Sequence, residues 1–108
     1  MSPNNKNAIT MNRDNILMLL CAQGYPEFML EQTADKVEKL SPKIAKAFED
    51  WADEGTIPTM EICGYSYNKL IKNFNMRPIA AFLALDWLVR EPEKASEALK
   101  RGIRKLKV

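Results

Sequence analysis

The sequence predicts an all-α protein, a compact bundle of five to six short helices with at most one short accessory strand near residues 59–63. Two observations predict this fold class. Apolar residues recur at helical spacing along most of the chain, and Gly, Ser-Pro and Pro signals divide these stretches into short segments. The composition agrees, because 46% hydrophobic and 28% charged residues are ordinary proportions for a globular domain.

The domain organisation follows from length and polarity. Residues 1–10 are polar, contain three asparagines and offer little to bury, so we expect a disordered N-terminal arm. The chain of 108 residues fits one domain. We therefore expect a single helical domain over residues 11–108.

Three helices are expected in the first half of the chain, each bounded by recognisable cap residues. The first begins at an Asn12 or Asp14 cap and stops at Gly24, the second runs from Pro26 to Leu40, and the third runs from Pro42 to Gly55. A linker with one short extended strand should follow, because Thr56 to Gly64 contains Pro58 and alternates only weakly.

Three more helices are expected after the linker. Ser66 is a suitable cap for the fourth, and Asn75 tolerates the left-handed conformation that ends a helix. Pro78 begins a fifth helix that reaches Arg90, and Pro92 begins a sixth. The fifth is apolar on nearly all sides, so it is either central to the bundle or buried at a partner interface.

Most enzyme classes are excluded by composition. The chain has no histidine, so catalysis and metal binding that depend on imidazole are absent from it. Cys21 and Cys63 are far apart and are expected to be small core residues of a cytoplasmic protein. No catalytic pair, metal-ligand spacing or phosphate-binding glycine loop is present. We expect a non-enzyme with no cofactor, no metal and no small-molecule substrate.

Charge is unevenly distributed along the chain. The formal net charge is only +2, yet residues 26–61 carry four bases and nine acids, whereas residues 62–108 carry ten bases and four acids. The last nine residues contain five bases and no acid. This distribution predicts a basic surface in the C-terminal half.

Residues 65–90 carry a family resemblance. The segment Leu70-Ile71-Lys72-Asn73-Phe74-Asn75-Met76-Arg77-Pro78-Ile79-Ala80-Ala81, extended to Leu85, Trp87 and Leu88, resembles the two-helix unit of helix-turn-helix and winged-helix DNA-binding domains. In the turn, Asn75 replaces the usual glycine and Arg77 the usual Ser/Thr cap, both of which are tolerable. Two further departures are larger. The groove-facing positions would be Ile79, Phe82, Leu83 and Asp86, which read bases poorly, and residues 91–108 lack the turn signals of a wing.

Two functional hypotheses remain. The first is a DNA-associated regulatory or accessory protein that binds double-stranded DNA mainly through backbone contacts. Its expected binding residues are Lys69, Lys72, Asn73, Arg77, Lys100, Arg101, Arg104, Lys105 and Lys107. The alternative is a protein-interaction module, a homodimer or an adaptor, whose interface is formed by Ile79, Phe82, Leu83 and Trp87. Membrane binding is not expected, because the last helix has a thin apolar face without aromatic residues.

Overall fold

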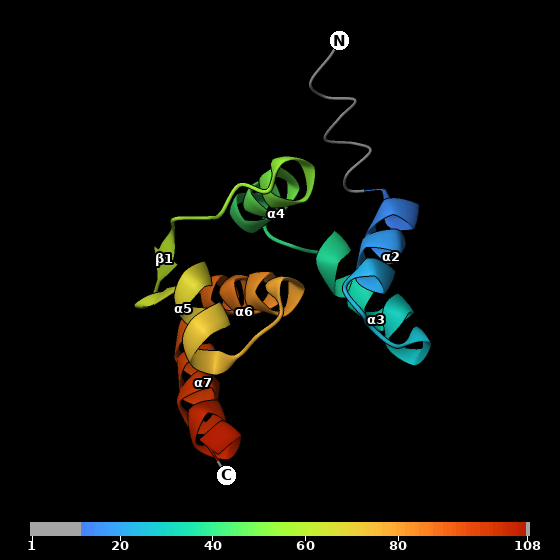
Figure 1. Cartoon of the computed structure of the whole chain (residues 1–108). Helices are drawn as coiled ribbons and strands as arrows, with labels where there is room; N and C mark the ends of the chain where they lie inside the picture. Colours follow the sequence, from blue (N-terminus) through green and yellow to red (C-terminus); the bar gives the residue numbers. More distant parts are fainter. Residues whose placement is uncertain (1–11, 108) are drawn as a thin grey trace. The chain divides into compact units, whose positions relative to one another are not determined.

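The computed structural model describes the backbone of residues 12–107 and the side chains of residues 12–102 (Figure 1). Over that backbone the chain forms six helices and one two-stranded antiparallel sheet, so the predicted fold class is confirmed. The chain divides into two compact units, Met1–Thr56 and Ile57–Val108. The single domain expected over residues 11–108 stays a prediction, and the arm expected at residues 1–10 lies outside the described residues.

The first unit contains α2 (Arg13–Ala22), α3 (Glu27–Glu38) and α4 (Pro42–Glu54). The predicted bounds of these helices are close to those observed, because cap residues at the helix ends determine where each helix begins and stops. The Asn12 side chain accepts a hydrogen bond from the Asp14 backbone N–H at 2.8 Å, and Gly55 ends α4 in the left-handed conformation.

Helices α2 and α3 pack against each other. Ile16 and Leu20 of α2 and Ala34 and Val37 of α3 are almost fully buried. An ion-pair cluster joins the outer surfaces of the two helices, since the Arg13 guanidinium lies 3.0 Å from Asp35 and 2.7 Å from Glu38 and also pairs with Glu31. These three carboxylates raise the pKa of Arg13 above its ordinary value, chiefly through the hydrogen bond that the guanidinium donates to Glu31.

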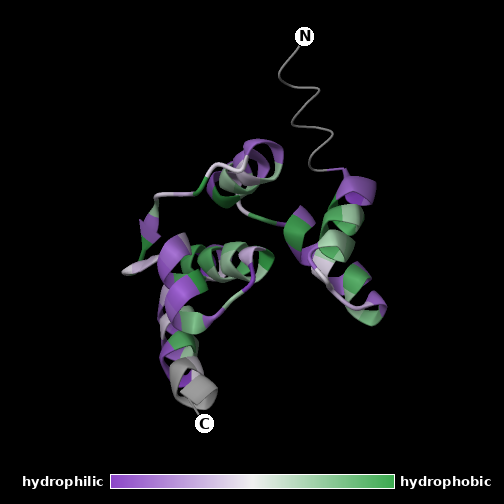
Figure 2. Cartoon of the chain, in the orientation of Figure 1, coloured by the Kyte–Doolittle hydropathy of each residue, from purple (hydrophilic) through white to green (hydrophobic). Residues whose placement is uncertain are grey.

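The second unit contains β1 (Glu61–Ile62), β2 (Tyr65–Ser66), α5 (Tyr67–Phe74), α6 (Pro78–Arg90) and α7 (Pro92–Lys107). Helix α6 is central to it, because it contacts α5, α7 and β1. Figure 2 shows α6 as predominantly hydrophobic, and its residues Ile79, Phe82, Leu85 and Leu88 are each 1% exposed or less. Among the described residues, no helix is both long enough and apolar enough to cross a bilayer.

The sheet is a hairpin of two strands with two residues each, whereas a single strand was expected near residues 59–63. Glu61 pairs with Ser66 and Ile62 with Tyr65. The two turn residues both have positive φ, 56° at Cys63 and 84° at Gly64, as a type I′ hairpin turn requires. The sequence did not predict the second strand because cysteine rarely occupies a left-handed turn position.

Both cysteines are exposed and free, so their expected burial in the core is wrong. Cys63 is exposed because it occupies the tip of the hairpin turn. Cys21 lies in the last turn of α2, one residue beyond the buried Leu20.

The connection from α5 to α6 follows the predicted local signals. The Ser66 hydroxyl accepts a hydrogen bond from the Lys69 backbone N–H at 3.1 Å, and Asn75 ends α5 with φ 56° and ψ 39°. The next backbone N–H, that of Met76, donates to the Leu70 carbonyl at 3.3 Å. Pro78 then begins α6, so only three residues separate the two helices.

Candidate functional site

The outer face of α5 is the clearest candidate site in the second unit. The helix buries Tyr67, Leu70 and Phe74 and half-buries Ile71. Because residues on a helix advance by about 100°, its polar side chains form a separate exposed face. That face consists of Asn68, Lys69, Lys72 and Asn73, all exposed, and it continues into the turn with exposed Asn75 and Arg77.

None of these six residues is acidic. The chain has no Asp or Glu between Glu61 and Asp86, so the exposed side chains of α5 and its turn carry only ammonium, guanidinium and amide groups. Ammonium and guanidinium are hydrogen-bond donors only, and an amide both donates and accepts. The α5 face, by which we mean Asn68, Lys69, Lys72, Asn73, Asn75 and Arg77, is therefore suited to an anionic, acceptor-rich partner.

Lys69 is held in place by the hairpin. Its ammonium donates to the Gly64 carbonyl at 3.3 Å and lies 5.0 Å from the centre of the Tyr65 ring, in a cation–π arrangement. Tyr65 is itself fixed by an edge contact with Phe74, with ring centroids 5.8 Å apart. The hairpin thus orients the first cation of the α5 face.

The two described cations expected on α7 lie in a mixed surface. Arg101 pairs with Glu97 at 3.6 Å, and Lys100 lines a shallow depression together with Cys63, Glu93 and Glu97. Acids therefore accompany the cations on this part of α7. The backbone of Arg104, Lys105 and Lys107 belongs to α7, and their side chains lie outside the described residues.

The residues expected at a partner interface on α6 are not equally accessible. Ile79 and Phe82 are each 1% exposed, and Phe82 contacts the Tyr67 ring with centroids 5.2 Å apart. Leu83 is half-buried, and Trp87 is 39% exposed. Only Leu83 and Trp87 thus present side-chain surface in the structure.

Base reading by α6 has little physical support. Of the four positions that would face a groove, Ile79, Phe82 and Asp86 are buried. The Asp86 carboxylate pairs with Arg90 Nε at 2.8 Å on the same helix. The exposed residues of α6 are Trp87, Val89 and Arg90, all in its last turn.

The sequence predicted Lys69, Lys72, Asn73 and Arg77 of the α5 face but not Asn68 and Asn75. The available signal was the absence of any acid over the segment that follows Glu61. Among the side chains of residues 12–102, no three or more Cys, Asp or Glu lie together in a group that could hold a metal ion.

Comparison of the chain with protein-family models, with curated proteins and with solved structures gave no match.

Proposed function

We propose that this protein associates with double-stranded DNA through the phosphate backbone, using the α5 face. One observation carries the proposal: six neighbouring exposed positions on α5 and its turn hold three cations, three asparagines and no acid. Phosphate oxygens are acceptors, and lysine, arginine and asparagine are among the side chains that contact them. The resemblance of residues 65–90 to helix-turn-helix units points to the same ligand.

Binding of this kind is expected to depend on salt and only weakly on sequence. If Lys69, Lys72 and Arg77 each neutralise one phosphate, the logarithm of the association constant should fall with the logarithm of salt concentration with a slope of about −2.7. Ile79, Phe82 and Asp86 are buried, so these groove-facing positions of α6 offer no accessible polar side chain that could discriminate bases. Affinity for unrelated duplexes should therefore be similar.

The first test is Lys72→Glu. Lys72 is exposed on the α5 face, so reversing its charge should weaken binding by about tenfold at low salt and lower the magnitude of the salt slope by about one. Fluorescence anisotropy of a labelled mixed-sequence duplex, titrated at low and moderate salt, measures both quantities.

Lys43→Glu is the matched control, since Lys43 is also an exposed lysine, in the second position of α4. It changes the net charge by the same amount and should leave both affinity and salt slope close to those of the wild type. Equal losses in the two variants would mean that net charge alone drives binding, and the assignment to α5 would be wrong.

A further inference from the structure

The two lysines of the α5 face differ in how their side chains are held. Lys69 and Lys72 are both exposed and lie three residues apart on one helix. The Lys69 ammonium has two partners on the hairpin, whereas the Lys72 side chain has no hydrogen bond, ion pair or ring contact with another described residue. The pair therefore allows the effect of the hairpin contacts on binding to be measured.

Lys69 is fixed at both its backbone and its ammonium. Its backbone N–H donates to the Ser66 hydroxyl at 3.1 Å. Its ammonium donates to the Gly64 carbonyl at 3.3 Å and lies 5.0 Å from the centre of the Tyr65 ring. Tyr65 is 9% exposed, and its ring makes an edge contact with Phe74. Because Tyr65 belongs to the core of the unit, its ring is a rigid support for the ammonium.

The Lys69 ammonium retains hydrogen-bond donors for a phosphate. A lysine ammonium has three N–H groups, and the Gly64 carbonyl accepts from one of them. The Tyr65 ring attracts the positive charge through its π face. A phosphate oxygen can therefore accept from a remaining N–H group while both hairpin contacts persist.

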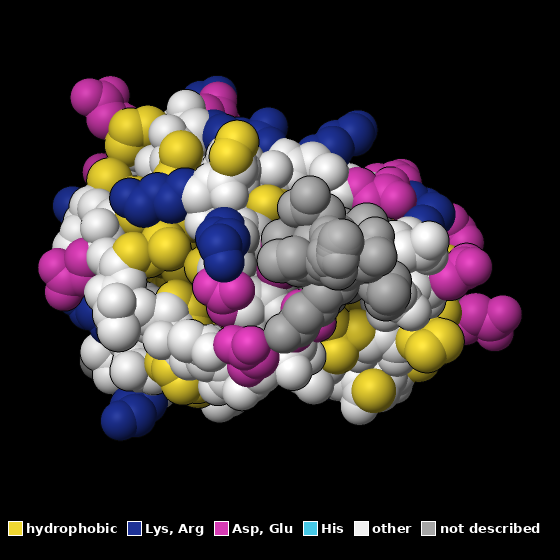
Figure 3. All heavy atoms as spheres, turned by 90° about the horizontal axis from the view of Figure 1, so that it is seen from above, with side chains coloured by type: hydrophobic (Ala, Val, Ile, Leu, Met, Phe, Trp, Pro, Cys, Tyr) yellow, Lys and Arg dark blue, Asp and Glu magenta, His cyan; other side chains and the backbone are white. Residues whose placement is uncertain are grey.

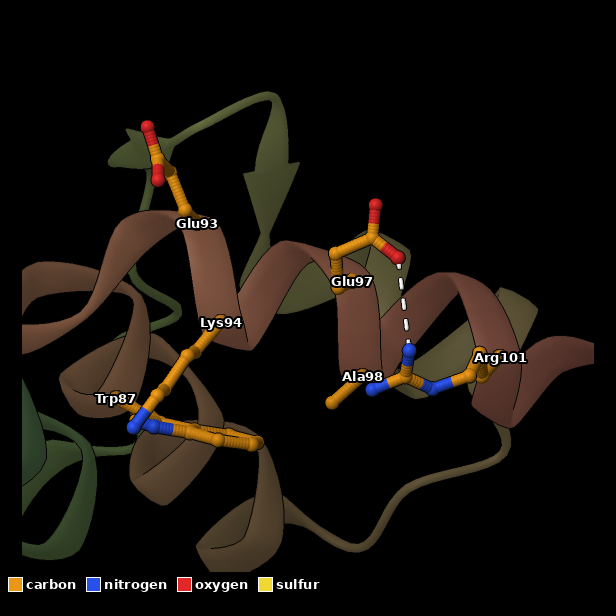
Figure 4. A pocket seen from close by; sticks show the side chains of 6 residues that line it. All are labelled: Trp87, Glu93, Lys94, Glu97, Ala98 and Arg101. Carbon is orange, nitrogen blue, oxygen red and sulfur yellow. Dashed lines mark ion pairs between the residues drawn. The ribbon is translucent and has the colours of Figure 1, made fainter.

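Lys94 on α7 is a contrasting case. Figure 4 shows its side chain extending toward the Trp87 indole, but its ammonium also lies 3.6 Å from a Glu91 carboxylate oxygen. Such proximity of opposite charges is visible elsewhere, since Lys and Arg side chains occur together with Asp and Glu on the face drawn in Figure 3. The ring and the carbonyl that hold Lys69 carry no charge, so they orient this cation without neutralising it.

We infer that Tyr65 is a positioning residue for DNA binding, whose ring holds the Lys69 ammonium in the orientation in which it contacts a phosphate of the duplex. The inference rests on the proposed function of the α5 face. A lysine side chain loses rotamer freedom when it is immobilised on a ligand, and one that is already oriented loses less. Lys69 therefore contributes more to affinity than Lys72, although each neutralises one phosphate.

The first test compares Lys69→Met with Lys72→Met, because methionine removes the charge and keeps an unbranched side chain. Fluorescence anisotropy of the labelled mixed-sequence duplex, titrated at several salt concentrations, gives affinity and salt slope. Each variant should lower the magnitude of the slope by about one. Lys69→Met should weaken binding about threefold more than Lys72→Met at every salt concentration. Equal losses, or a larger loss for Lys72→Met, would contradict the inference.

The second test changes Tyr65 itself. Tyr65→Leu removes the ring and should weaken binding about threefold with the salt slope unchanged, since the number of neutralised phosphates stays the same. Tyr65→Phe keeps the ring and should bind like the wild type. In a Lys69→Met background, Tyr65→Leu should have no further effect, whereas a purely structural role would weaken binding in both backgrounds. Unchanged or tighter binding by Tyr65→Leu would overturn the inference.

Circular dichroism checks the folding of each variant, because Tyr65 packs against Phe74. If Tyr65→Leu does not fold, the comparison of Lys69→Met with Lys72→Met decides, since it leaves the ring in place. A wild-type protein that does not bind the duplex at low salt overturns the proposed function and the inference with it. A wild type that binds, with equal losses in the two lysine variants, overturns the inference alone.

Discussion

At the scale of single residues, Glu91 shows how one exposed carboxylate organises a surface. It accepts from the Trp87 indole and lies beside the Lys94 ammonium. The hydrogen bond from Trp87, followed by the positive charge of Lys94, lowers the pKa of Glu91 below its ordinary value of 4.5. The ionised form is therefore the one that holds the indole in place.

The lowered pKa of Glu91 predicts that its contribution to protein stability changes with pH only under acidic conditions. Because the folded-state pKa is lower than the unfolded one, the stabilising contribution of Glu91 is present above the ordinary pKa and is lost as pH falls through the folded value. An NMR titration of the Glu91 carboxyl carbon should give a pKa below 4.5, and Trp87→Phe should raise it. A pKa that Trp87→Phe leaves unchanged would contradict the hydrogen bond as the main cause.

At the scale of secondary-structure elements, the hairpin positions the beginning of α5. Its turn presents the Gly64 carbonyl to Lys69, and its second strand ends at Ser66, whose hydroxyl caps the helix. Cys63 has φ 56° in this turn. Glycine tolerates this conformation because it has no Cβ, and asparagine because its side chain can form local hydrogen bonds, whereas cysteine has neither property.

Substitutions in this turn should change stability in opposite directions. Cys63→Asn creates the Asn-Gly pair that type I′ turns favour and should raise the free energy of unfolding by up to about 1 kcal/mol. Gly64→Ala should lower it by about 1 kcal/mol, because alanine is strained at φ 84° although nothing lies within 4 Å of its Cβ. Urea denaturation measures both changes, and equal signs would rule out the type I′ assignment.

The elements that the sequence predicted correctly are those fixed by neighbouring residues. Ser66, Asn75 and Pro78 set the bounds of α5 and α6 through their own hydrogen bonds and backbone angles. The hairpin was missed because its turn depends on an uncommon conformation of Cys63.

Burial was harder to predict than helix position. Helix α6 is apolar on nearly every side, so its sequence does not indicate which side neighbouring helices cover. In the structure, α6 packs against α5, α7 and β1, and its Ile79 and Phe82 are buried whereas Trp87 is exposed. The α5 face was predicted in part, since its cations and Asn73 were recognised, whereas Asn68 and Asn75 were not.

At the scale of the whole molecule, the two units differ in charge. Residues 1–56 carry six bases and nine acids, and residues 57–108 carry ten bases and five acids. A polyanion is therefore attracted to the second unit and repelled by the first, over distances of about 10 Å at moderate ionic strength. Within the second unit, the described part of α7 mixes both signs, which leaves α5 as the acid-free surface.

The most direct test of DNA binding by the α5 face is an amide NMR titration of the full chain with a short mixed-sequence duplex at low salt. The largest shift changes should fall on residues 66–77, with small changes across α2, α3 and α4, and added salt should reverse them. Changes centred on α2 to α4, or no changes at concentrations where the protein is folded, would contradict the proposal that the α5 face binds DNA.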